Sequence, residues 1–208
     1  IRSRGFKVGA TNERHPKIDV FNYLGDMAIK QIFDAGVCPY NNNFLLICNN
    51  DFGPYIAKTL SKMCSKLGVI DLDSNKNKYD LDAVDWIGGF PKIDIPNLYK
   101  SCEAIIFTAY PFDNEWIGNK TPILINDLKS QIDNPYILRF CGDINTADVS
   151  KSGLRYFPNK VGSGHMGILP SAIGFDPIIR LQSGGLKVGE SFILNEECFE
   201  GDLLYELV

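Results

Sequence analysis

Two side chains in the second half of the sequence have the chemistry for acid and base catalysis. His165 lies in a glycine-dense stretch, and an imidazole there can donate or accept a proton at a reacting oxygen. Arg139 lies in an apolar run, where a guanidinium can hold a carboxylate through paired hydrogen bonds. A carboxylate such as Asp143 or Glu190 could hold the imidazole in its charged form. The alternative is structural: His165 caps a turn and Arg139 forms an ion pair.

The segment Asn49-Asn50-Asp51-Phe52-Gly53 has features of a phosphate-binding turn. It follows an apolar run and precedes a helical pattern, and the first turn of a helix offers unpaired N–H groups that suit a phosphate. Aligned on the dinucleotide-binding pattern G-x-G-x-x-G, the segment keeps the last glycine alone, and Asp51 puts a negative charge near the expected pyrophosphate. A capped turn that binds nothing is the alternative.

Two aspartates follow at the distance expected of a ribose-binding acid. Asp71 and Asp73 lie 18 and 20 residues beyond Gly53, where an acidic side chain accepts hydrogen bonds from the adenosine ribose. A carboxylate at this place repels a 2′-phosphate, so the spacing favours NAD over NADP. The alternative is that both are solvated aspartates at a strand end.

The elements that would position these residues alternate along the chain. Short apolar runs predict strands, and apolar residues at helical spacing between them predict helices. Strands alternating with helices predict a doubly wound, mostly parallel, Rossmann-like α/β sheet, with ligands outside the carboxyl ends of its strands. The predicted strands are 44–48, 69–73, 104–109 and 136–141, and the predicted helices are 18–35, 54–67, 95–101 and 121–132.

The last fifty residues have a different composition. Glycine becomes dense after Gly142, so residues 156–208 are expected to form a glycine-rich appendage of loops, short helices and an added hairpin. We expect one domain over residues 1–208, with its core at about 44–155. The stretches 162–170 and 182–187 also have the composition of backbone nests that bind a phosphate or carboxylate, although packing loops explain both as well.

The order of these segments resembles the NAD-binding half of the D-2-hydroxyacid dehydrogenase and adenosylhomocysteinase group. The resemblance covers about residues 44–170 and includes the glycine turn, the acidic strand end, the loop Ala109-Tyr110-Pro111 and the run Ile137 to Asn145. It implies that Ala109, Pro111 and Gly142 line an NAD site. It also implies that Arg139 faces a substrate carboxylate and that a loop at 164–167 delivers a catalytic histidine, His165. Two turn glycines and a complete substrate-binding domain are missing from this pattern.

Composition excludes several other classes of function. The 208 residues carry a net charge of -4, and the basic residues are scattered. A protein that binds nucleic acid or an anionic membrane surface is expected to have a clustered basic patch instead. The longest apolar runs are far shorter than the roughly 20 residues that span a bilayer. No metal-ligand spacing or G-x-S-x-G motif occurs, and the six dispersed cysteines indicate reduced thiols in the cytoplasm. Because the sequence begins with Ile1, we expect a processed or truncated piece of a longer protein.

Three functions remain at this point. The first is an NAD-dependent dehydrogenase-like domain acting on a small hydroxy or oxo acid, with His165 and Arg139 at the reaction centre. The second is a non-catalytic nucleotide-binding or interaction module of a larger protein or biosynthetic assembly. The third is a transferase that uses a nucleotide-activated donor. The expected partner is a small molecule, and assembly into a homo-oligomer is left open.

Overall fold

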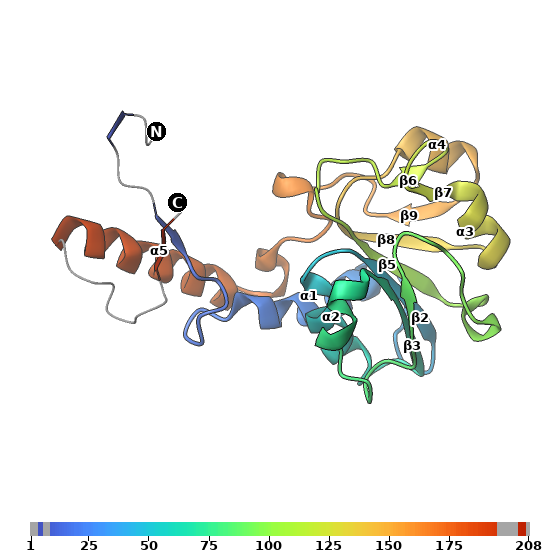
Figure 1. The fold of residues 1–208 in the computed structure, drawn as a ribbon, viewed down its shortest axis with the longest axis horizontal. Coiled ribbons are helices and arrows are strands. Elements are labelled where there is room, and N and C mark those ends of the chain that lie inside the picture. Colours follow the sequence, from blue (N-terminus) through green and yellow to red (C-terminus); the bar gives the residue numbers. More distant parts are fainter. Residues whose placement is uncertain (1–3, 6–8, 195–203, 207–208) are drawn as a thin grey trace.

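The computed structural model describes residues 4–5, 9–194 and 204–206, and for 204–206 it describes the backbone alone. Its centre is a sheet of six parallel strands in the spatial order β4-β3-β2-β5-β8-β9 (Figure 1). Numbered as they enter this sheet along the chain, the strands lie in the order 3-2-1-4-5-6, which is the Rossmann order. The predicted fold class is confirmed. The strands are β2 (Asn43–Cys48), β3 (Lys66–Asp71), β4 (Trp86–Gly89), β5 (Ala104–Thr108), β8 (Tyr136–Cys141) and β9 (Arg155–Phe157).

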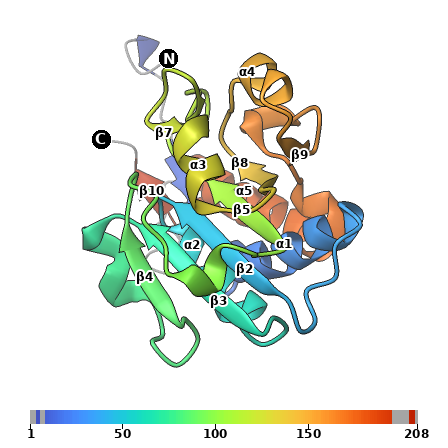
Figure 2. The ribbon, with the colours of Figure 1, turned by 90° about the vertical axis from the view of Figure 1, so that its right-hand side faces the viewer.

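Helices cover both faces of this sheet (Figure 2). The central strand β2 is fully buried from Phe44 to Cys48, as expected of a parallel strand with a helical layer on either side. Its even-numbered side chains join the apolar layer of α1 and α2, and its odd-numbered side chains join the layer of α3 and α4. The helices are α1 (Tyr23–Asp34), α2 (Phe52–Leu60), α3 (Ile125–Gln131) and α4 (Thr146–Lys151).

Several predicted elements form with shifted bounds. Strand β3 covers Lys66–Asp71 instead of 69–73, and the 3-10 helix η3 (Asp73–Lys78) follows it. Helix α2 begins at Phe52, two residues before the proline expected to open it, and ends at Leu60. The predicted helix 18–35 divides into the 3-10 helix η2 (Val20–Asn22) and α1. The predicted stretches 95–101 and 121–132 contain η4 (Asn97–Tyr99) and α3.

The two edge strands of the sheet are absent from the prediction. Strand β4 is only partly buried and contains two glycines, and β9 has three residues, so neither has the apolar run that identified the central strands. A small pair, β6 (Ile117–Gly118) and β7 (Ile123–Leu124), also went unpredicted. Each edge strand has a neighbouring strand on one side only, and its side chains on both faces are only partly buried, so its sequence is less apolar.

The C-terminal region differs most from the prediction. Instead of loops and short helices, its main element is α5 (Asp176–Leu194), a helix of 19 residues that extends away from the sheet beside β1 (Gly9–Thr11) and β10 (Leu204–Glu206) (Figure 1). A Cβ at Gly184 would lie 2.7 Å from atoms of Ile18 and Thr11, so this glycine permits close packing of the helix and does not mark a loop. The proposed nest at 182–187 lies inside α5, and that prediction is wrong. Two 3-10 helices, η5 (Ser163–His165) and η6 (Pro170–Ile173), precede it.

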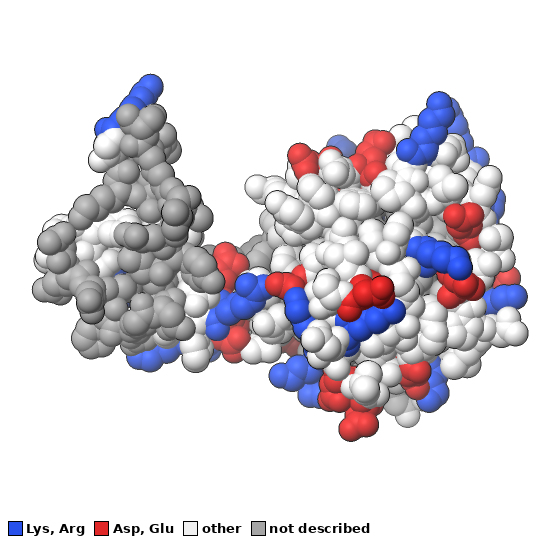
Figure 3. Space-filling view, viewed as in Figure 1, with Lys and Arg blue, Asp and Glu red and all other residues white. Residues whose placement is uncertain are grey.

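Charged side chains of both signs are interspersed over the visible face of the sheet-containing part (Figure 3). No helix within the described ranges combines the length and the apolar character that crossing a bilayer requires.

Candidate functional site

The loops after β2 and β5 are joined at the carboxyl edge of the sheet. Asn49 donates its side-chain Nδ2 to the carbonyl of Tyr110 at 2.9 Å and accepts the Tyr110 N–H at 2.7 Å. Asn50 Nδ2 donates to Thr108 Oγ1 at 3.1 Å. These strands are the first and fourth of the Rossmann order, and ligands bind where the strand order reverses between them. The amides of Asn49 and Asn50 therefore bridge the switch point itself.

The first turn of α2 offers few free backbone donors. Asn50 Oδ1 accepts the Phe52 N–H at 3.0 Å, and Pro54 has no N–H to give. Asp51 precedes the helix at its N-cap position, where its carboxylate would oppose a second anion. A pyrophosphate at this turn would thus meet a different set of groups from the backbone amides of a glycine turn.

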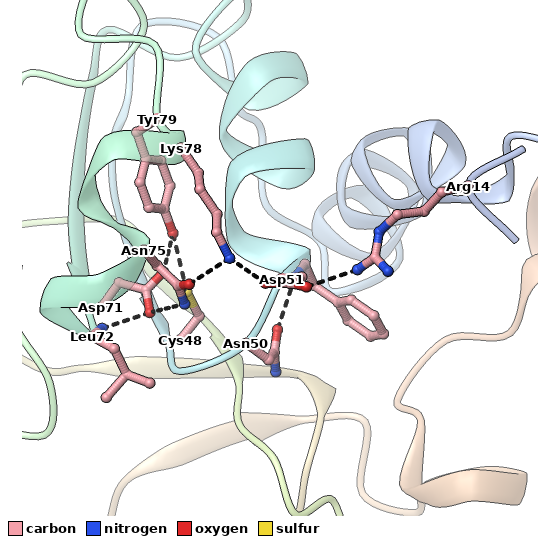
Figure 4. Close-up of polar contacts among 10 residues, drawn as sticks. Arg14, Cys48, Asn50, Asp51, Asp71, Leu72, Asn75, Lys78 and Tyr79 are labelled. Carbon is pink, nitrogen blue, oxygen red and sulfur yellow. Dashed lines mark hydrogen bonds and ion pairs between the residues drawn. The ribbon is translucent and has the colours of Figure 1, made fainter. Parts of the chain in front are cut away.

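Cations from two other elements meet at Asp51 (Figure 4). Arg14, from the N-terminal segment, lies 2.8 Å from Asp51 Oδ2, and Lys78, at the end of η3, lies 2.7 Å from Asp51 Oδ1. The hydrogen bond from Lys78 lowers the pKa of the Asp51 carboxyl group. All three side chains are about half exposed and line a cavity of about 490 Å³ together with Tyr55. Neither cation could be recognised from the sequence, because Arg14 lies in a segment without periodicity and Lys78 lies in an Asn/Lys-rich stretch.

Gly53 serves packing in this structure. It is buried, and a Cβ built on it would lie 2.1 Å from the Tyr79 hydroxyl oxygen and 2.4 Å from Cys48 Sγ. The last glycine of a dinucleotide-binding turn has this same role, since it lets the helix approach the strand closely. The side of Gly53 where a Cβ would stand faces Tyr79 and Cys48 in the interior.

Asp71 ends β3 inside the protein and has no exposed surface. Its Oδ2 accepts hydrogen bonds from Cys48 Sγ at 2.8 Å and from the Tyr79 hydroxyl at 2.6 Å. Its Oδ1 accepts from Asn75 Nδ2 at 3.1 Å and from the backbone N–H of Leu72 at 2.6 Å (Figure 4). Burial raises the pKa of the Cys48 thiol and of the Tyr79 phenol, so both remain protonated donors.

This enclosure corrects the expectation that Asp71 meets a ribose. Both carboxylate oxygens already accept hydrogen bonds from within the protein, and the residue has no exposed surface for a ligand to contact. Of the two predicted acids, Asp73 alone is exposed, and it pairs with Lys76 at 2.8 Å. Any ribose contact from this strand end therefore falls to Asp73.

The remaining predicted cofactor residues line the loops after β5 and β8. Ala109 and Gly142 are both buried, and the Ala109 N–H donates to the Cys141 carbonyl at 3.0 Å. Gly142 has a φ of 103°, and a Cβ there would lie 2.7 Å from the Ala109 carbonyl oxygen, so only glycine fits. Pro111 is exposed. Ala109 and Gly142 are therefore part of the buried backbone beneath these loops, and of the three residues only Pro111 is exposed to a ligand.

The loop after β8 brings together the predicted catalytic residues. His165 Nδ1 lies 2.7 Å from Asp143 Oδ2, and Arg139 Nη2 donates to Asp143 Oδ1 at 3.1 Å. The His165 side chain is 43% exposed, whereas that of Arg139 is 4% exposed. Glu190, the other acid considered for His165, pairs with Lys187 on α5. Asp143 is thus the partner of the imidazole.

The placement of Arg139 does not provide the predicted contact with a substrate carboxylate. Its guanidinium is buried, and it donates a hydrogen bond to Asp143 instead of facing solvent. Burial lowers the pKa of Arg139 and the nearby Asp143 raises it. An arginine remains charged under these conditions, so a full positive charge lies beneath the Asp143 carboxylate.

Aromatic rings line the carboxyl edge near the α2 turn. Phe52 and Phe112 have ring centroids 5.7 Å apart, and Tyr110 meets Phe112 edge-on at 5.3 Å. Phe52 and Phe112 are partly exposed, and Tyr110 is 60% exposed. Such rings give an apolar surface against which a flat ligand can stack.

The cysteines make no disulfide within the described residues. Cys48, Cys102 and Cys141 are buried free thiols, Cys64 is half-buried, and Cys38 is exposed. Cys198 lies outside the described residues. Within those residues there is also no group of histidine, cysteine and carboxylate side chains that could hold a metal ion.

No protein-family model and no curated protein sequence matches this chain. The fold resembles a dipicolinate synthase from Bacillus subtilis (TM-score 0.56, 13% identity, 89% of this chain and 58% of the other). It also resembles a formate dehydrogenase from Granulicella M. (TM-score 0.57, 12% identity, 99% of this chain and 62% of the other). A dipicolinate synthase from Bacillus halodurans is a further match (TM-score 0.52, 9% identity, 81% of this chain and 55% of the other).

These likenesses establish the fold. The dehydrogenase resemblance predicted from the sequence is confirmed at this level, because a formate dehydrogenase shares the arrangement along almost the whole chain. The chain spans 58% and 62% of the length of the first two neighbours.

Proposed function

We propose that this chain is an NAD-binding, oxidoreductase-like domain that acts on a small hydroxy or oxo acid or a related substrate. The observation that carries the proposal is the 2.7 Å contact between His165 and Asp143 in the loop after β8. A partly exposed imidazole held by a carboxylate is the arrangement used for proton transfer at a carbonyl or hydroxyl oxygen. The Rossmann strand order and the formate dehydrogenase neighbour support the choice of a dinucleotide.

The residues at the α2 turn fit NAD with modified phosphate contacts. Asn49, Asn50 and Phe52 are partly exposed there, and Arg14 and Lys78 supply positive charge in place of the missing glycine amides. A bound pyrophosphate would draw these two cations away from Asp51. Asp73 and Pro111 are exposed at neighbouring loops and complete the proposed contacts, with Ala109, Gly142 and Gly53 forming the closed backbone beneath.

In this proposal NAD supplies the hydride acceptor, and the protein supplies the proton transfer. With Nδ1 of His165 directed at Asp143, Nε2 is the ring nitrogen left to take a proton from a substrate hydroxyl or return one to a carbonyl oxygen. The Asp143 carboxylate stabilises the ring when it is charged. Asp143 also fixes the ring orientation, which a freely rotating imidazole would lose.

A non-catalytic nucleotide-binding or interaction module remains the second candidate. The observation that favours it is the α2 turn itself, where Asp51 lies at the N-cap and Pro54 offers no N–H. A turn with so few backbone N–H donors would bind a nucleotide weakly, as is compatible with a module of a larger assembly.

The proposal includes a single domain over residues 1–208 and a cytoplasmic location. Free buried thiols support a reducing compartment, where disulfides are rare. The proposed partner is a small-molecule substrate, with no nucleic acid involved, and self-association is compatible with it.

Thermal unfolding with and without NAD tests the dinucleotide site, and turnover of hydroxy acids separates the two candidates. NAD at 100 times its Kd should stabilise the protein by about 2.7 kcal/mol, whereas NADP should stabilise it less. The variant His165→Asn should keep the NAD-induced shift and lose turnover with a panel of hydroxy acids. Ser163→Ala changes an exposed residue of the same 3-10 helix and serves as the matched control. No stabilisation by either dinucleotide, or turnover that survives in His165→Asn, would refute the proposal.

A further inference from the structure

The buried guanidinium of Arg139 has an unusual position for a charged group. It lies in the centre of β8, a strand with no exposed surface from Ile137 to Cys141 beyond the 3% of Arg139. Its Nη2 bonds Asp143, and its Nε has no hydrogen-bond partner. Removing such a charge from water is costly, and losing its partner would leave the charge uncompensated in the interior.

Asp143 divides its two oxygens between Arg139 and His165. Oδ1 accepts from the guanidinium at 3.1 Å, and Oδ2 faces the imidazole Nδ1 at 2.7 Å. The carboxylate is thereby held from below by a rigid strand and presents its second oxygen to the ring. Its orientation depends on Arg139, because a carboxylate with one anchored oxygen cannot turn without breaking that bond.

The backbone around His165 is fixed by the same strand. The His165 carbonyl accepts the Gly142 N–H at 3.1 Å, and the Gly167 N–H donates to the Phe140 carbonyl at 2.9 Å. His165 itself has a φ of 58°, a left-handed conformation that is uncommon for residues other than glycine. A register shift between β5 and β8 occurs next to Arg139, as bulges often do where a side chain is re-aimed.

From these contacts we infer that Arg139 is a positioning residue: it fixes the Asp143 carboxylate, which in turn sets the protonated nitrogen and the orientation of the His165 ring. The inference rests on the proposed function for the role of the ring, and it replaces the direct substrate contact expected of Arg139. Among the described residues, the titratable groups near this loop include Asp143, with Arg139 and Tyr156 behind it, and Glu115, whose backbone forms a β-bridge with Asp143. They also include Cys141, whose Sγ lies 4.0 Å from the Gly164 carbonyl oxygen.

The ring tautomer provides a readout independent of turnover. With Asp143 fixed, neutral His165 should carry its proton on Nδ1, which nitrogen-15 NMR distinguishes from a proton on Nε2. Arg139→Gln should lose this preference and give a mixture of the two tautomers. Arg139→Lys keeps the positive charge and should restore most of the wild-type signal. Asp143→Asn should abolish the preference, and adding Arg139→Gln to it should change nothing more.

Each outcome decides the inference. A wild-type tautomer in Arg139→Gln overturns it, and so does an effect of that substitution that persists in the Asp143→Asn background. If both Arg139 variants fail to fold while Asp143→Asn folds, Arg139 is required by the core and the inference also fails. The NAD-induced thermal shift of the wild-type protein reports separately on the proposed function, because its absence would leave the tautomer measurements valid.

Discussion

Replacing Gly53 by alanine should destabilise the protein whether or not NAD is present. The added Cβ would lie 2.1 Å from the Tyr79 hydroxyl, about 1.3 Å short of the 3.4 Å at which ordinary contact begins. It would also lie 2.4 Å from Cys48 Sγ. Neither atom can swing away freely, because both are hydrogen-bonded to Asp71. Overpacking of this kind costs about 1–3 kcal/mol, and we expect the upper part of that range.

The companion variant Tyr79→Phe removes the closest atom of this clash. Alone it should cost about 1.5–3 kcal/mol, since the lost hydrogen bond goes to a buried carboxylate. Combined with Gly53→Ala, it should cost at least about 1 kcal/mol less than the sum of the two single changes, because the hydroxyl is no longer there to be displaced. Urea unfolding of the four proteins gives the free energies of unfolding for this cycle.

Gly189 provides the control for this experiment. Its ideal Cβ position has no atom within 4 Å, and it lies inside helix α5, so alanine there should be neutral or stabilising by up to about 1 kcal/mol. A Gly53→Ala protein as stable as the wild type, or a strictly additive double variant, would show that the contact with Tyr79 is not what requires glycine.

Two further predictions concern charge and thiol chemistry. Asp51→Asn should tighten NAD binding about fivefold in calorimetry, since removing one half-exposed charge beside a phosphate is worth about 1 kcal/mol; the lowered pKa of Asp51 keeps that charge present at pH 7. Asp80→Asn removes another exposed acid lining the same cavity and should change the NAD affinity little. Equal NAD affinities of the wild type and Asp51→Asn would contradict the proposed position of the phosphate. Alkylation at pH 8 should modify exposed Cys38 before Cys48 and Cys102, because burial raises the pKa of the Cys48 thiol and raises that of Cys102 to about 12. Peptide mass spectrometry measures the order, and equal rates would show that the buried thiols are accessible.

The central sheet could be predicted from the sequence because its strands are enclosed on both faces. The buried part of β2, from Phe44 to Cys48, is apolar throughout, and that run is visible without any structure. The edge strands lack this requirement, so β4 and β9 carried no comparable signal. Helix α5 was missed because its glycines were interpreted as loop residues, whereas Gly184 permits contact with Ile18.

The candidate site could be predicted only in part from the sequence. The predicted association of His165 with a carboxylate agrees with its contact to Asp143, which the turn after β8 brings into reach. The inward orientation of the Asp71 side chain could not be predicted, because its partners Tyr79 and Cys48 are distant in the sequence and come close only in the folded protein. Spacing along a chain fixes which strand end a residue occupies, but packing decides whether it turns outward or inward.

The pairing of β2 has a consequence for how the chain acquires its structure during synthesis. Strand β2 is first of the six in chain order, yet its second neighbour, β5, joins it through pairs such as Phe44 with Ala104. The whole intervening stretch, with β3 and β4, must therefore leave the ribosome before this fully apolar strand has both of its hydrogen-bonding partners. Such delayed, non-local pairing slows folding. Until β5 is available, one edge of β2 stays unpaired and can associate with other chains. Slower translation should therefore lengthen this interval and lower the yield of soluble protein.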